Sequence, residues 1–137
     1  MAEIERRPKT GDSEKITINL GYVDLGQIDL LVQEGFYSNR TDLIRTAIRN
    51  QLDRHGEALK QSVVRHQFEL GVREFTRAQL EKVRDDGEKL HIQVLGLAVI
   101  AADVTPELAL QTIAAIHVLG ALQASPAVNA ALGDRIR

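Results

Sequence analysis

The first regular pattern of apolar and polar positions lies at residues 15–20. Polar and apolar side chains alternate there without interruption, which is the period of a strand with one buried face. The pattern predicts a strand that turns Ile16, Ile18 and Leu20 toward a core. Lys15, Thr17 and Asn19 would face the opposite way.

Two helical patterns follow this predicted strand. Apolar residues at helical spacing run from Val23 to Val32, and Gly35 stands where a left-handed C-terminal cap is expected. Ser38 precedes the second pattern and is predicted to cap it, because its side-chain oxygen can accept a hydrogen bond from a first-turn amide. The second helix carries one apolar stripe, formed by Leu43, Ile44, Ala47, Ile48 and Leu52.

The predicted strand needs a partner, because a lone strand leaves its backbone groups unpaired along both edges. The next candidate strand lies beyond both helices. A strand with two short helices also buries too little surface to fold alone. We therefore expect residues 15–52 to form a homodimer in which two strands make an antiparallel ribbon over four intertwined helices.

The second half of the chain repeats the dipeptide Leu-Gly, at positions 70–71, 95–96 and 119–120. Strand-like stretches surround the dipeptides at residues 68–75, 90–101 and 116–122. A predicted helix cap follows each stretch, and these caps are Thr76, Thr105 and Ser125, the last two before a proline. The short helices after them carry Leu80 and Val83, Leu108 and Ile113, and Val128 and Leu132.

A repeat of about 24 residues with one strand and one helix has the length of a solenoid coil. We interpret residues 66–137 as a small right-handed β/α solenoid, with residues 101–104 as a loop in the middle copy. The repeat resembles leucine-rich repeats in period and order but lacks their asparagine or cysteine position. A compact α+β domain with the same strands is the alternative. Exposed sheet edges on a solenoid favour higher-order self-association through residues 66–137.

The predicted fold class is therefore α+β, divided into four segments. Residues 1–14 read as a flexible arm that contains the basic side chains Arg6, Arg7 and Lys9. Residues 15–52 form the dimerising unit, residues 53–65 a helical connector, and residues 66–137 the strand-helix repeat domain.

Composition narrows the possible functions. The chain has 17 basic and 19 acidic residues, so it does not coat nucleic acid by bulk charge, and any DNA contact must be local. It has no cysteine, which excludes disulfides and thiolate chemistry and suits a cytoplasmic protein. The charged start and the shortness of the longest apolar run predict neither a secretory signal nor a membrane span.

The sequence contains none of the motifs that would indicate catalytic or metal-binding residues. None of the four histidines pairs with another at the spacing of a helical metal site. The chain also lacks a glycine-rich phosphate loop and a nucleophile-elbow motif. We therefore expect no catalytic residues, no metal site, no cofactor and no enzymatic activity.

The segment KITINL...VDLGQIDLLVQEGFYSNRTDLIRTAIRNQL resembles the CopG/Arc/MetJ family of ribbon-helix-helix DNA-binding regulators. The resemblance covers residues 15–52 and rests on the alternating strand, on Gly35 between the helices and on the polar opening of the second helix. It departs from the family where many members have proline after the strand, because Gly21 and Tyr22 stand there.

This resemblance implies that an intermolecular two-stranded ribbon enters the major groove of double-stranded DNA. The outward side chains Lys15, Thr17 and Asn19 would then contact bases, and all three residue types suit base edges. Ser38, Asn39 and Arg40, at the start of the second helix, would contact phosphates. The implied function is a sequence-specific transcriptional regulator, expected to be a repressor and to be associated with the nucleoid.

Two other functions stay open. Residues 15–52 could serve mainly for dimerisation while residues 66–137 polymerise, which would make a scaffold or filament protein. An antitoxin-type autoregulator, whose second half captures a toxin, is the other possibility. Such capture segments commonly fold on binding, whereas this one has enough apolar periodicity to fold unaided.

Overall fold

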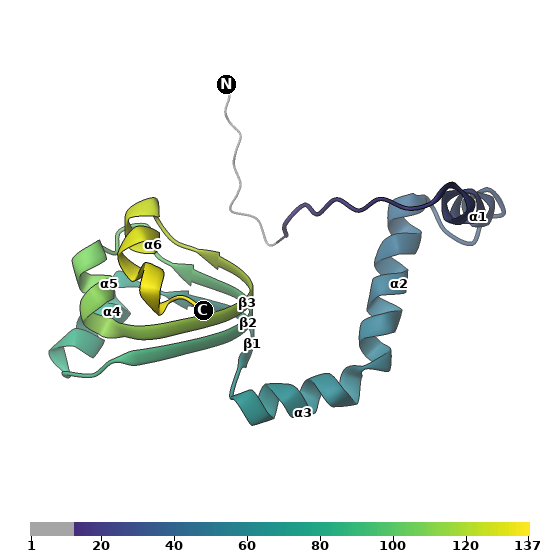
Figure 1. Ribbon diagram of the computed structural model, residues 1–137. Coiled ribbons are helices and arrows are strands. Elements are labelled where there is room, and N and C mark those ends of the chain that lie inside the picture. The colour runs from purple at the N-terminus through teal and green to yellow at the C-terminus, as the bar shows by residue number, and fades with distance from the viewer. Residues whose placement is uncertain (1–12) are drawn as a thin grey trace, which may run out of the picture. The chain divides into compact units, whose positions relative to one another are not determined.

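The structure is a computed structural model that describes residues 13–137 (Figure 1). Residues 1–12 of the predicted arm at residues 1–14, which include its basic side chains, lie outside the described residues. The chain divides into two compact units, at residues 13–62 and 63–137, and each unit is described by itself.

The first unit contains α1 (Tyr22–Gln33), α2 (Arg40–Arg54) and most of α3 (Gly56–His66). Residues 13–21 precede α1 and belong to no helix or strand in the single chain. The strand predicted at residues 15–20 is thus not formed within one chain. The physical reason is that a strand is held by backbone hydrogen bonds to a neighbouring strand. Among the described residues, no strand pairs with residues 15–20.

The turn between α1 and α2 follows the predicted glycine cap. Gly35 has a φ of 88°, the left-handed conformation that glycine adopts without steric cost. The Phe36 N–H donates to the carbonyl of Leu31 at 3.0 Å, and the Gly35 N–H donates to that of Val32 at 3.1 Å. This pair of bonds is the Schellman motif that closes helix C-termini, so the prediction for Gly35 is confirmed.

The cap of α2 is Asn39, and the prediction that Ser38 caps this helix is wrong. The Asn39 side chain accepts a hydrogen bond from the Asp42 N–H at 2.8 Å. The Asp42 carboxylate in turn accepts one from the Ser38 N–H at 2.9 Å. Asparagine and serine cap equally well, and these two bonds at Asp42 set the start of α2 one residue later than predicted.

Residues 13–62 contain no buried side chain. Ile16, Ile18, Phe36 and Leu52 are all more than half exposed. A chain segment of this length does not leave its apolar residues in water when it is folded, because their burial supplies the main stabilising free energy. The first unit of one chain therefore lacks a core of its own.

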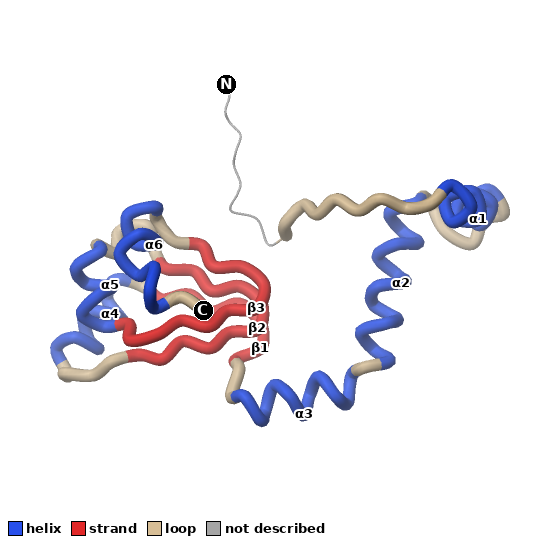
Figure 2. The backbone as a smooth tube through the Cα atoms, viewed as in Figure 1, coloured by secondary structure: helices blue, strands red, loops and turns tan. Residues whose placement is uncertain are grey.

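The second unit alternates strands and helices. Its elements are β1 (Glu69–Phe75), α4 (Arg77–Asp85), β2 (Leu90–Ile100), α5 (Pro106–Thr112), β3 (Ile113–Gln123), α6 (Pro126–Leu132) and the 3-10 turn Gly133–Arg135. The strands form one parallel sheet in the order β1-β2-β3. Figure 2 shows the strands curving around one side of the unit, with the helices opposite them. All three predicted strands are present.

The three helix caps of this unit match the prediction. Thr76, Thr105 and Ser125 each accept a hydrogen bond from the backbone N–H three residues later. Residues 101–104 form the expected loop between β2 and α5. Ile113 was expected on the helix but begins β3 directly after α5, in keeping with the strand preference of β-branched residues.

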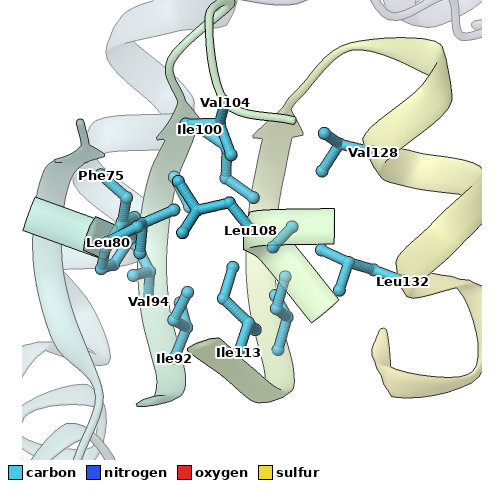
Figure 3. Close-up of a cluster of buried hydrophobic side chains, with 13 residues drawn as sticks. Phe75, Leu80, Ile92, Val94, Ile100, Val104, Leu108, Ile113, Val128 and Leu132 are labelled. Atoms are coloured by element: carbon cyan, nitrogen blue, oxygen red, sulfur yellow. The ribbon is translucent and has the colours of Figure 1, made fainter. Parts of the chain in front are cut away.

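The core lies between the sheet and the three helices (Figure 3). Alternate residues of β2 fill it, namely Ile92, Val94, Ala98 and Ile100. The helices contribute Leu80 from α4, Leu108 from α5, and Val128 and Leu132 from α6. Each βα unit thus buries one face against the same core. Leu95 and Leu97, which alternate with the core residues, are only partly buried.

The Leu-Gly dipeptides align in the sheet. Gly71 pairs with Gly96 in β1-β2, and Gly96 pairs with Gly120 in β2-β3. All three glycines have φ between 121° and 138°, so each strand departs from extended geometry at the same row. A Cβ built on Gly96 would lie 2.2 Å from the Gly71 carbonyl oxygen, and one on Gly120 would lie 2.0 Å from that of Gly96. Only glycine fits the two inner positions.

The two edges of the sheet differ. On the β3 side, Ile136 forms a parallel bridge with Ile116, and the Arg137 N–H donates to the Ile116 carbonyl at 2.8 Å. The Arg135 guanidinium holds this C-terminal segment through the carbonyls of Leu110 and Ile113, at 2.7 and 2.8 Å. The outer edge of β1 has no neighbouring strand in the described chain.

Candidate nucleic-acid interface

The three predicted base-contacting residues lie on the extended segment before α1. Lys15, Thr17 and Asn19 are all exposed. The side chains that alternate with them are exposed as well, at 72% for Ile16 and 62% for Ile18. The segment therefore keeps one polar and one apolar set of side chains, but the structure shows no buried position for either set among residues 13–62.

Antiparallel pairing of this segment with its copy would separate the two sets. Side chains of a two-stranded ribbon project alternately to opposite faces. Ile16 and Ile18 would then face the apolar side chains that α1 and α2 leave exposed, among them Val23, Leu30, Ile48 and Leu52. Lys15, Thr17 and Asn19 would form the outer face of the ribbon.

The start of α2 offers backbone donors for an anion. The amides of the first helical turn have no intrahelical acceptor, and they lie at the positive end of the helix dipole. The Asp42 N–H is already taken by Asn39, which leaves the Arg40 and Thr41 N–H groups at this end. The three predicted phosphate-contacting residues, Ser38, Asn39 and Arg40, surround it and are exposed.

Arg40 is held by an acidic side chain that the sequence analysis did not single out. Its Nε and Nη2 atoms donate to the two carboxylate oxygens of Asp29, each at 2.8 Å. This bidentate ion pair joins α1 to α2 and fixes the plane of the guanidinium. No sequence signal points to the pair, because 11 residues and a turn separate its members and neither periodicity nor a motif links them.

The ion pair shifts the ionisation of both groups. The hydrogen bond from Arg40 lowers the pKa of Asp29 below its usual value, and the same bond raises the pKa of Arg40. A lowered carboxyl pKa contributes stability that is present above the unfolded-state pKa and is lost as pH falls through the folded-state pKa. The raised arginine pKa acts only at extreme alkaline pH.

Replacing Asp29 with asparagine tests this contribution. The wild-type protein is expected to lose stability on acidification below about pH 4, the range in which an aspartate protonates, and Asp29→Asn should lose less over the same interval. The change should be small, because both side chains are more than half exposed to solvent. Thermal unfolding midpoints measured between neutral pH and pH 3 give the comparison, with Asp24→Asn, an exposed α1 aspartate, as control. Equal acid sensitivity of Asp29→Asn and wild type would contradict the assignment.

A shallow depression of about 170 Å³ in the second unit is lined by His91, Gln93, His117 and Arg137 among others. Phe68 packs edge-on against His117, with ring centroids 5.1 Å apart. Within residues 13–137, no group of three or more acidic or histidine side chains is placed to hold a metal ion. Over the same residues, no helix is both long and apolar enough to cross a bilayer.

Comparison with known proteins identifies the class. A model of the Ribbon-Helix-Helix transcriptional regulator family matches residues 11–129, and the chain belongs to this family. The match extends far beyond residues 15–52, so the strand-helix unit is part of what the family model describes. Members of the family generally bind DNA as dimers. Neither the curated proteins nor the solved structures contain a match to the chain.

Proposed function

We propose that this protein is a dimeric, sequence-specific repressor that inserts a two-stranded ribbon into the major groove of DNA. The observation that carries the proposal is the state of residues 13–62, which have a strand-period segment and two helices but no buried residue. A second copy supplies both the missing ladder and the missing core. Family membership supports DNA as the target.

The residue roles follow from the two faces of the ribbon. Lys15 can donate to guanine, Asn19 can form two hydrogen bonds with an adenine edge, and Thr17 can bond a base or contact a thymine methyl group. The start of α2 anchors the phosphate backbone through its free amides and through Ser38 and Asn39. Arg40 keeps Nη1 outside its ion pair and adds charge near the same phosphate.

Residues 66–137 serve assembly in this proposal. The aligned strands and the glycine row, formed by Gly71, Gly96 and Gly120, support the interpretation of these residues as solenoid-like βα repeats. Association of this unit would join dimers, so that adjacent operator sites are bound together with a gain from effective concentration. The protein acts without catalysis or a cofactor, on nucleoid DNA in the cytoplasm.

Fluorescence anisotropy with full-length protein tests the DNA-binding function. Labelled fragments of the region upstream of its own gene are compared with random DNA of equal length at one fixed salt concentration. We expect at least one fragment to bind about 1,000-fold more tightly than random DNA. Equal affinity for all fragments would overturn sequence-specific binding and favour the scaffold alternative.

A further inference from the structure

The outer edge of β1 combines unpaired backbone with exposed apolar side chains. Leu70 is 75% exposed and Val72 is 70% exposed. The opposite sheet edge is bridged by Ile136 and Arg137, so the two ends of the sheet are not equivalent. Natural proteins usually protect such an edge from pairing with another strand.

The glycine row shows which backbone groups β1 presents outward. The Gly71 carbonyl oxygen faces β2, because it is the atom that a Cβ on Gly96 would meet. The Phe75 carbonyl also faces β2 and its loop, since it accepts from the Ala101 N–H at 3.0 Å. Backbone groups alternate sides along a strand, so Leu70 and Val72 turn their N–H and C=O groups to the open edge.

The residue order of β1 is complementary to itself in one antiparallel register. When two β1 strands pair about a two-fold axis at Gly71, Leu70 lies opposite Val72 of the second copy and exchanges both backbone hydrogen bonds with it. Glu69 then lies opposite the second copy's Arg73. Opposite charges and apolar pairs facing each other stabilise an antiparallel pair.

The registers shifted toward the C-terminal end of β1 lack this complementarity. An axis at Val72 places Glu74 opposite Leu70 and Glu69 opposite Phe75. An axis at Arg73 places the two arginines opposite each other, which is destabilising. The axis at Gly71 is also sterically open, because nothing lies within 4 Å of a Cβ built there.

We propose that β1 pairs with β1 of a second copy of this chain, antiparallel and centred on Gly71. The two sheets then form one continuous six-stranded sheet, and the contact is isologous and closes on itself. Glu69 and Arg73, which form an ion pair at 3.3 Å within one chain, also make ion pairs across the axis. This contact specifies how residues 66–137 would carry out the assembly role proposed above. It rests on that proposed role, because assembly is what brings two copies together.

Engineered cysteines test this register, because the natural chain has none. Directly opposite residues of an antiparallel pair lie about 4.5–5.5 Å apart at Cα, within the range of a disulfide. Full-length protein with Leu70→Cys and Val72→Cys should form a covalent dimer under mild oxidation, with peptide mapping showing a link between positions 70 and 72. Ala127→Cys with Asn129→Cys, two exposed positions on α6, controls for random collision and should give little dimer.

A second cysteine pair tests the alternative arrangement, in which copies associate head to tail through β1 and β3. If β1 paired in parallel with β3 of another copy, the repeat register would place Leu70 beside Leu119, and Leu70→Cys with Leu119→Cys would form a ladder of polymers. We expect no ladder. A polymer ladder, or a dimer yield from the 70/72 pair no greater than that of the α6 control, would overturn the proposal.

Charge variants of the 70/72 cysteine protein separate the contact between copies from the ion pair within one chain. Glu69→Arg and Arg73→Glu each place like charges across the axis, which destabilises an antiparallel pair, so each alone should reduce covalent dimer about 10-fold. Mixing the two variants and allowing subunit exchange should restore it, because opposite charges then meet across copies while the internal pair stays broken. No restoration would contradict the register.

DNA anisotropy of the same variants reports on the first unit separately, so failure of this contact is distinguishable from failure of DNA binding.

Discussion

Alanine at Lys15, Thr17 and Asn19 together is expected to abolish sequence preference in DNA binding. The three side chains are exposed and belong to the polar positions of residues 15–20. Their removal should therefore leave the apolar positions Ile16, Ile18 and Leu20, and with them the dimer, intact. Specific sites exceed random DNA by a factor of about 1,000 or more, and base contacts each supply about 1–3 kcal/mol of discrimination. We therefore expect the affinity of the triple variant for its best fragment to fall to that for random DNA.

Anisotropy at fixed salt measures this loss, and light scattering checks that the variant is still a dimer. Alanine at Asn50 and Lys60, which are exposed residues of α2 and α3, is the matched control and should keep the preference. A triple variant that dissociates into monomers would show that the polar and apolar faces of the strand are assigned the wrong way round. Full retention of specificity in a dimer would remove these residues as base readers.

Gly96→Ala is expected to destabilise the second unit strongly. The added Cβ would lie 2.2 Å from the Gly71 carbonyl oxygen, a backbone atom that cannot swing aside as a side chain can. Backbone strain at positive φ and overpacking together should lower the free energy of unfolding by about 2–5 kcal/mol. That is a large part of the total stability of a small domain.

Gly71→Ala provides the comparison for this prediction. Gly71 has a similar φ of 122°, but within one chain nothing lies within 4 Å of its Cβ position, so only the backbone strain of about 1–2 kcal/mol remains. Urea unfolding followed by circular dichroism should rank wild type above Gly71→Ala and Gly71→Ala above Gly96→Ala. Equal losses for the two variants would show that the close approach to the neighbouring strand has no energetic weight.

Much of the second unit could be predicted from sequence because its signals are local. The three strands, the caps at Thr76, Thr105 and Ser125, and the loop at residues 101–104 each follow from a few adjacent residues. The recurring Leu-Gly dipeptide predicted that the strands align, and Gly71, Gly96 and Gly120 do align in register. Ile113 was misplaced because α5 passes into β3 without a loop, and no turn residue marks that boundary.

The candidate interface is less determined by the sequence. The alternation at residues 15–20 indicates which side chains share a face, but a strand also needs a ladder, and the single chain supplies none. The choice of Asn39 over Ser38 as the cap depends on two bonds at Asp42, whose N–H donates to the Asn39 side chain and whose carboxylate accepts from the Ser38 N–H, since both residue types cap well.

The sequence by itself determined the order of helices and strands after residue 21, the helix caps of the second unit, and the alternation of polar and apolar residues at residues 15–20. These are properties of residue type and spacing. Only the tertiary structure decided that Asp29 holds Arg40, that the C-terminal segment bridges β3 at Ile116, and that no strand of the described residues pairs with the outer edge of β1. Those contacts join residues distant along the chain, and their geometry depends on how whole elements pack, which local periodicity does not encode.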